Sequence, residues 1–96
     1  MRIRYLSVAE VELVDAISHY ETIEAGLGIR FFTEVVNTID RIGRYSEAWP
    51  QVSKNARRCR TKVFPFGIIY QLRVDEIVIV AIAELHREPN YWKERI

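Results

Sequence analysis

Residues 57–83 read RRCRTKVFPFGIIYQLRVDEIVIVAIA, and this stretch decides the fold. It is the most strand-like part of the chain, because apolar β-branched and aromatic side chains dominate 63–70 and again 77–82. Pro65 has no N–H and interrupts the first run, while Asp75 and Glu76 predict a tight hairpin turn before the last one. We therefore expect three consecutive antiparallel strands, over 57–63, 66–74 and 77–83.

The entrance to this stretch is densely basic. Arg57, Arg58, Arg60 and Lys62 follow one another closely, with no acid among them. Alternate side chains of a strand share a face, so Arg58, Arg60 and Lys62 would form one basic row opposite a face of smaller or apolar side chains. A row of fixed cations suits a polyanion. The simpler interpretation is a charged edge strand that resists aggregation.

The first half of the chain predicts a short strand and two helices. Residues 2–6 alternate in a strand pattern, and Ser7 with Glu10 has the spacing of a capping box, which marks a helix start. Helical periodicity continues to about Ile23, and Gly26 to Gly28 stop this helix. A second helix is expected over 29–45, a loop over 46–56 and an irregular tail over 84–96. The expected inward stripe of the second helix is Phe32, Val35, Val36, Ile39, Ile42 and Gly43, and Phe31 broadens it.

This order of elements predicts an α+β fold. An N-terminal strand, an antiparallel helix pair and a three-stranded antiparallel meander would form one sheet with the helices packed on one face. The length of 96 residues favours a single domain over 1–96, and 49% hydrophobic with 28% charged residues is ordinary for a globular protein. We see no signal peptide and no run long enough to span a bilayer, and Cys59 is the single cysteine, so we expect a cytoplasmic protein.

Two short motifs make the chain similar to a known family. Residues 64–70, FPFGIIY, are similar to the FPY-x-x-x-Y strand of RelE/ParE-superfamily toxins from bacterial type II toxin–antitoxin systems, and residues 89–92, PNYW, match one large subgroup. The order of elements agrees over nearly the whole chain. The resemblance implies a toxin that inhibits cell growth and is neutralised by a cognate antitoxin in a hetero-oligomer. We expect no cofactor, and His19 and His86 are too isolated to predict a metal site.

The resemblance leaves two mechanisms open, and with them the question whether the chain is an enzyme. RelE-like members cut mRNA on the ribosome, whereas ParE-like members inhibit DNA gyrase without hydrolysis. An endoribonuclease needs groups that move protons and cations that stabilise the developing charge. The resemblance puts Gly67 where an arginine is expected on the middle strand, which weighs against the endoribonuclease. It places the other candidate catalytic groups at Arg58, Arg60, Lys62, Arg87 and Tyr91, and His86 is a further candidate acid or base.

Overall fold

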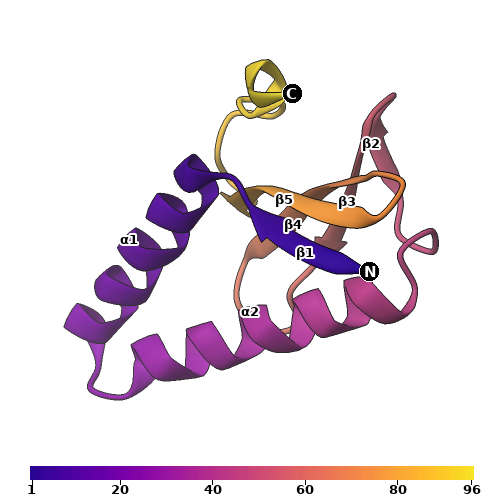
Figure 1. Ribbon diagram of the computed structural model, residues 1–96. Coiled ribbons are helices and arrows are strands. Elements are labelled where there is room, and N and C mark those ends of the chain that lie inside the picture. Colours follow the sequence, from indigo (N-terminus) through magenta and orange to yellow (C-terminus); the bar gives the residue numbers. More distant parts are fainter.

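The computed structural model describes all residues, 1–96, and Figure 1 shows one sheet with the second helix beneath it and the first helix at its left side. The chain runs through β1 (Arg2–Tyr5), α1 (Ser7–Ile23), α2 (Leu27–Arg44), β2 (Gln51–Ser53), β3 (Ala56–Arg60), β4 (Phe66–Leu72), β5 (Glu76–Glu84) and a short 3-10 helix, η1 (Lys93–Arg95). Neither α-helix combines the length and the apolar composition that a membrane crossing requires.

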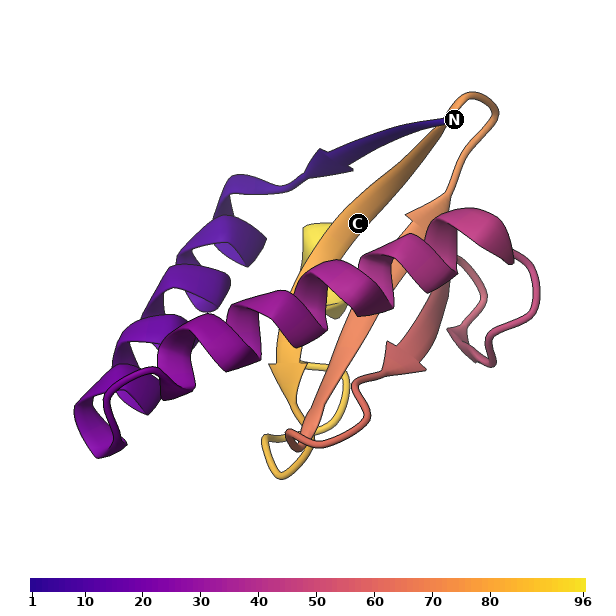
Figure 2. The ribbon, with the colours of Figure 1, turned by 90° about the horizontal axis from the view of Figure 1, so that it is seen from below.

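The five strands form a mixed sheet in the order β1-β5-β4-β3-β2. β1 lies parallel to β5, with Ile3 opposite Ile77, and all other neighbours are antiparallel. Residues 77–83 of β5 are buried on both faces, as their continuous apolar sequence predicts for a central strand. In Figure 2, α2 runs across one face of the sheet. The predicted α+β fold, with both helices on one side, is confirmed.

The basic end of the sheet differs from the prediction in two ways. Gln51–Ser53 forms the edge strand β2, although this segment was expected to be loop, because Lys54 and Asn55 turn the chain back onto β3. β3 ends at Arg60 rather than at Val63. The next residue, Thr61, folds a tight loop by donating from its hydroxyl to the carbonyls of Phe64 and Phe66. Lys62 therefore lies beyond the strand.

The turn between the helices depends on Gly26, Gly28 and Glu21. Gly26 has a φ of 88°, in the left-handed region that favours glycine. The Glu21 carboxylate accepts hydrogen bonds from the Gly26 N–H at 2.9 Å and from the Gly28 N–H at 3.0 Å. A Cβ on Gly28 would lie 2.7 Å from the Ile17 carbonyl oxygen, so this glycine allows α2 to approach α1 closely. The predicted capping box does not form, since Leu6 is the N-cap of α1 and no side chain caps it.

The helix-side core is organised around Phe31 rather than Phe32. Phe31, which was expected only to broaden the inward stripe, is fully buried, whereas Phe32 and Val36, both expected within the stripe, are 38% and 46% exposed. The chain carries adjacent apolar pairs at 31–32 and 35–36, so the sequence pattern fits either rotation of the helix. Phe31 packs in a ring cluster with Tyr20, Phe64 and Phe66, with centroid distances of 4.8 Å to Phe66 and 5.2 Å to Phe64.

The opposite face of the sheet carries a second, smaller apolar cluster. Its buried residues include Ile69, Val78, Val80 and Ala81, with Trp92 of the C-terminal tail packed against them. Strict alternation along β5 would place Ala81 on the helix side with Ile77 and Ile79. A bulge between Ile69 and Tyr70 leaves Val80 out of the pairing register, so Val80 and Ala81 both join this face. The tail, at the top of Figure 1, thus covers the face that the helices leave free.

Candidate functional site

Three of the six candidate catalytic residues line one hollow. Arg58 from β3 and Arg87 and Tyr91 from the tail surround a space of about 170 Å³ on the tail side of the sheet. Glu84 and Glu88 also line it, so carboxylates accompany the two cations. The geometry therefore brings the strand and the tail together, although the meeting point is not purely cationic.

The other three candidates lie outside this hollow. Arg60, at the end of β3, is exposed, and its carbonyl accepts a hydrogen bond from Arg41 at 3.2 Å. Lys62 lines a separate polar hollow on α2 that also includes Glu34 and Asp40. The His86 side chain is 84% exposed and lies 4.0 Å from Glu84. The expected row of Arg58, Arg60 and Lys62 is thus broken after Arg60.

Gly67, where the family resemblance would place an arginine, is covered by Arg58. A Cβ on Gly67 would lie 2.8 Å from the Arg58 Cδ, so the aliphatic stem of Arg58 crosses the glycine directly. An arginine at position 67 would require Arg58 to move. The Arg58 side chain therefore covers Gly67 as well as its own position on this face of the sheet.

Tyr91 is held by one hydrogen bond and by two arginines over its ring. Its hydroxyl donates a hydrogen bond of 2.7 Å to Glu12, and its ring lies beneath the guanidinium carbon of Arg87 at 3.6 Å and that of Arg95 at 5.0 Å. Burial is the main cause that raises the pKa of the Tyr91 hydroxyl well above its usual range, and Glu12 raises it further. A hydroxyl that keeps its proton this strongly, and that already donates it to a carboxylate, is a weak general acid.

Glu12 is the residue at the centre of this network, and the sequence prediction missed it. Its side chain is only 13% exposed. It accepts hydrogen bonds from the Ile82 N–H at 3.0 Å and from Arg95 at 2.9 Å, and Arg95 also donates to the Val80 carbonyl at 3.0 Å. β1 pairs only with residues 76–79 of β5, so this ion pair satisfies backbone groups that β1 does not reach. The available signal was helical spacing, because Ala9, Glu12 and Ala16 share one face of α1.

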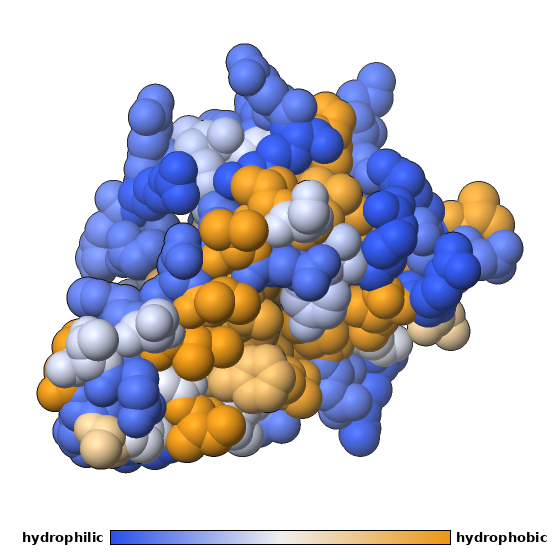
Figure 3. All heavy atoms as spheres, turned by 60° about the vertical axis from the view of Figure 1, so that its left-hand side comes forward, coloured by the Kyte–Doolittle hydropathy of each residue, from blue (hydrophilic) through white to orange (hydrophobic).

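The helices also present an apolar outer surface. Val8, Val11 and Val14 of α1 are 39%, 57% and 63% exposed, and Ile29 and Phe32 of α2 are exposed as well. Figure 3 looks at the α1 side of the molecule, where apolar side chains gather into a continuous area. We call Val8, Val11 and Val14 the α1 stripe. An exposed apolar area of this kind is typical of a surface that another protein covers.

Comparison with known proteins finds a solved structure with a similar fold but no match by sequence. No protein-family model matches the sequence, and no curated protein matches it either. A chain from the solved structure of the chromosomal ParDE TA system of P. aeruginosa superimposes with a TM-score of 0.70 at 15% sequence identity. The match covers 90% of this chain and 97% of that chain. The protein described above therefore has the same fold as a chain of a ParDE toxin–antitoxin system.

Proposed function

We propose that the chain is a RelE/ParE-superfamily toxin that acts in the cytoplasm and inhibits growth until a cognate antitoxin binds it. The fold similarity, which extends over 90% of the chain, supports this proposal. The FPFGIIY strand and the PNYW tail support it independently, since they are sequence features and the structural likeness does not depend on them. The α1 stripe supplies an apolar surface of the kind that an amphipathic antitoxin segment covers.

Inhibition by binding, with DNA gyrase as the target, is the mechanism that the geometry favours. The observation that carries this choice is the hydrogen bond from Tyr91 to Glu12, because it occupies the hydroxyl that RNA cleavage would need. Two further features agree with it. Lys62 lies in a different hollow from Arg58, and Gly67 supplies no side chain. What remains in the hollow is a pair of arginines, and arginine is a poor proton acceptor.

Ribosome-dependent mRNA cleavage is the second candidate. It is favoured by the meeting of Arg58 and Arg87 in one hollow, where two cations could stabilise a developing phosphate charge. His86, which precedes Arg87 on the same turn, would have to supply the proton transfer, because arginine is a poor proton acceptor. Glu84 and Glu88 in the same region oppose the approach of a phosphate.

Induced expression in growing bacteria separates the two mechanisms. Growth, gyrase-dependent DNA breaks and the positions of mRNA 5′ ends on ribosomes are measured together for the wild type, Arg58→Ala and Arg87→Ala. Arg44→Ala removes an exposed arginine of α2 and serves as the matched control. The proposal expects DNA breaks, intact mRNA and retained toxicity in both variants. Cuts in the ribosomal A site, abolished by both substitutions but not by the control, would instead establish the endoribonuclease.

The antitoxin part of the proposal has a separate test. Co-expression of each neighbouring gene should restore growth in one case and yield a complex that survives purification. A double change, Val11→Lys with Val14→Lys, places two charges on the α1 stripe and should leave toxicity intact while weakening neutralisation. If the antitoxin still fully neutralises the double variant, it must contact a surface other than the α1 stripe. Toxicity that no neighbouring gene relieves would count against the proposed system itself.

A further inference from the structure

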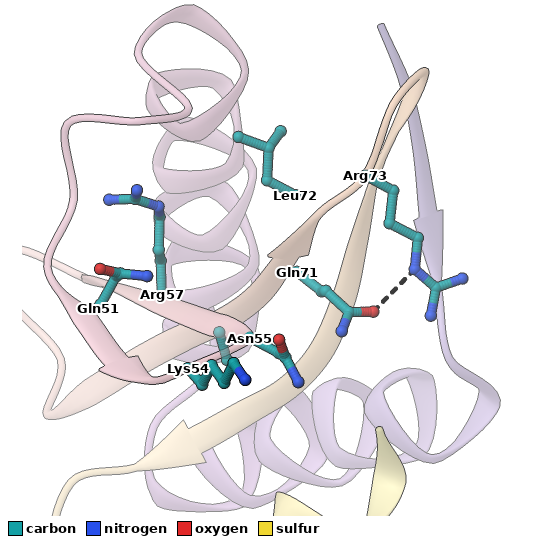
Figure 4. A pocket seen from close by; sticks show the side chains of 8 residues that line it. Gln51, Lys54, Asn55, Arg57, Gln71, Leu72 and Arg73 are labelled. Carbon is teal, nitrogen blue, oxygen red and sulfur yellow. Dashed lines mark hydrogen bonds between the residues drawn. The ribbon is translucent and has the colours of Figure 1, made fainter.

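A second hollow, of about 300 Å³, lies where β4 ends, and it is separate from the hollow of Arg58 and Arg87. The register explains why it exists. Pairing between β3 and β4 stops at Arg57 opposite Tyr70, whereas β4 continues to Leu72. The last residues of β4 therefore face the turn between β2 and β3 rather than a strand, and Figure 4 shows the resulting notch. We call it the basic hollow.

The lining of the basic hollow is almost entirely polar and carries only positive charge. Three cations and three side-chain amides surround it, and no carboxylate lines it. The cations are Lys54, Arg57 and Arg73, and the amides belong to Gln51, Asn55 and Gln71. The ion pairs of the structure use other basic residues, so none of these three charges is neutralised by a carboxylate.

Two of the cations are held in place without losing their charge. Arg57 donates from one terminal nitrogen to the carbonyl oxygens of Glu47 at 3.0 Å and Trp49 at 2.8 Å, and Figure 4 shows its guanidinium turned away from Gln71 and Arg73. Arg73 donates from Nε to the Gln71 amide oxygen at 2.8 Å, the dashed line in Figure 4. That bond orients the Gln71 amide, so its nitrogen remains a donor. Side chains fixed before binding lose less entropy when a ligand arrives.

The surrounding sequence strengthens the local charge. Residues 48–74 contain six Lys and Arg and no Asp or Glu. The formal charge of the whole chain is only +1, so the remainder is net acidic. Positive charge is thus concentrated on β2, β3, β4 and their loops, and β2 forms the edge of the sheet. An anion approaching this edge meets an attractive field before it contacts any side chain.

We propose that the basic hollow binds a phosphate group, carried by a nucleotide or by a nucleic-acid backbone. Phosphate accepts several hydrogen bonds at once, and guanidinium donors match its geometry in a bidentate manner. Lys54 and Arg73, with the Asn55 and Gln71 amides between them, supply such donors, and Arg57 adds a third positive charge from the far side of the hollow. This site shares no residue with the hollow of Arg58 and Arg87, and the inference does not depend on toxicity.

Direct binding measurements on the purified full chain test this site. Inorganic phosphate and AMP are titrated while backbone amide NMR shifts are followed, and a fluorescein-labelled single-stranded oligonucleotide is titrated by anisotropy. Lys54→Gln and Arg73→Gln change exposed side chains and should leave the fold intact, which circular dichroism checks. The double variant should bind the oligonucleotide or AMP at least tenfold more weakly. With a single strand, loss of two phosphate contacts should also flatten the slope of log affinity against log salt by about 1.4.

Arg30→Gln is the matched control for each single variant, because it removes one exposed positive charge at the start of α2, away from the hollow. Competition by AMP, with shifts at 54–57 and 71–73, would identify a nucleotide as the source of the phosphate; binding of the oligonucleotide alone would identify a nucleic-acid backbone. Equal weakening by Arg30→Gln would reduce the effect to net charge and overturn the proposal. Poly-glutamate binding as tightly as the phosphate probes, or unchanged affinity in the double variant, would overturn it as well.

Discussion

The carboxylate of Glu12 on α1 accepts a hydrogen bond of 2.7 Å from the hydroxyl of Tyr91 in the C-terminal tail. The same carboxylate binds Arg95 and the backbone N–H of Ile82. One side chain therefore joins a helix, the central strand and the tail. The position of Arg87 above the Tyr91 ring, and with it the shape of the candidate site, depends on this carboxylate.

Glu12→Gln tests how much this junction contributes to stability. The amide keeps the shape but removes the charge that compensates Arg95, whose side chain is only 16% exposed. We expect the free energy of unfolding to fall by about 3 kcal/mol, since breaking a largely buried ion pair leaves a charge without its partner. Urea unfolding measures the change. Glu10→Gln on the exposed side of α1 should stay within about 0.5 kcal/mol of the wild type, and equal effects of both variants would contradict the role of Glu12.

Gly28→Ala tests the close approach of the two helices. The added Cβ would lie 2.7 Å from the Ile17 backbone oxygen and 2.9 Å from the Glu21 carboxylate. Backbone cannot move aside cheaply, so we expect a loss of about 1–3 kcal/mol. Gly43→Ala in the same helix meets nothing closer than 3.9 Å and should stabilise the protein slightly, because alanine favours the helix. Thermal unfolding of both variants would contradict this account if Gly28→Ala were the more stable.

Ile39→Ala tests the helix-side core. Ile39 is 7% exposed on α2, and its truncation should cost about 2–5 kcal/mol. Val36, on the same helix, is 46% exposed, so Val36→Ala should cost less than about 1 kcal/mol. Denaturant midpoints for the two variants give the comparison. Similar values would mean that α2 packs with a different rotation from the one described.

Tyr70 predicts a loss of stability at alkaline pH. Burial raises the pKa of its hydroxyl from 10.0 to about 12, against a smaller lowering by Arg57. Because the folded-state value is the higher one, the stabilisation is complete below pH 10 and disappears as the pH rises toward 12. The loss should be about 3 kcal/mol. Tyr70→Phe should be less stable at neutral pH, since it gives up the bond to the Ser46 carbonyl, but should lose less between pH 10 and 12.

Urea unfolding at a series of pH values checks the Tyr70 prediction. Burial also raises the pKa of Tyr5, Tyr20 and Tyr91, so part of the alkaline loss should remain in Tyr70→Phe. Tyr45, whose side chain is exposed, supplies the control Tyr45→Phe. A Tyr70→Phe profile parallel to that of the wild type above pH 10 would contradict the assignment.

Local sequence patterns predicted the layers of this fold but not the details that depend on contacts distant in sequence. The apolar run of β5 and the Asp75–Glu76 turn indicated a central strand and a hairpin, and both are present. Phe32 and Val36 were wrongly expected within the inward stripe of α2, because two adjacent apolar pairs fit either rotation of the helix and only packing against Phe64 and Phe66 selects Phe31. The bulge that turns Ala81 to the tail side has no signal in an all-apolar strand.

The candidate site shows the same division. Arg58, Arg87 and Tyr91 could be grouped from motifs, and the structure places them around one hollow. Lys62 lies elsewhere because hydrogen bonds from Thr61 to Phe64 and Phe66 bend the chain after β3. Strand alternation in the sequence does not predict such a bend. The sequence did not predict that Glu12 is buried, because a charged residue on a helix usually lies in solvent. Only its partners, seventy and more positions later in the chain, explain its burial.

The parallel pairing of β1 with β5 has a consequence for the order of folding. Arg2 pairs with Glu76, which is 74 positions later in the chain, whereas β4 and β5 are joined by a short turn. Closing so long a loop costs entropy before any contact forms, so β1 should dock after the meander and the helices have assembled. Ile3→Ala should then accelerate unfolding and leave the refolding rate nearly unchanged, which stopped-flow measurements would show. β1, although it is synthesised before every other strand, would then be the last strand to pair in the sheet.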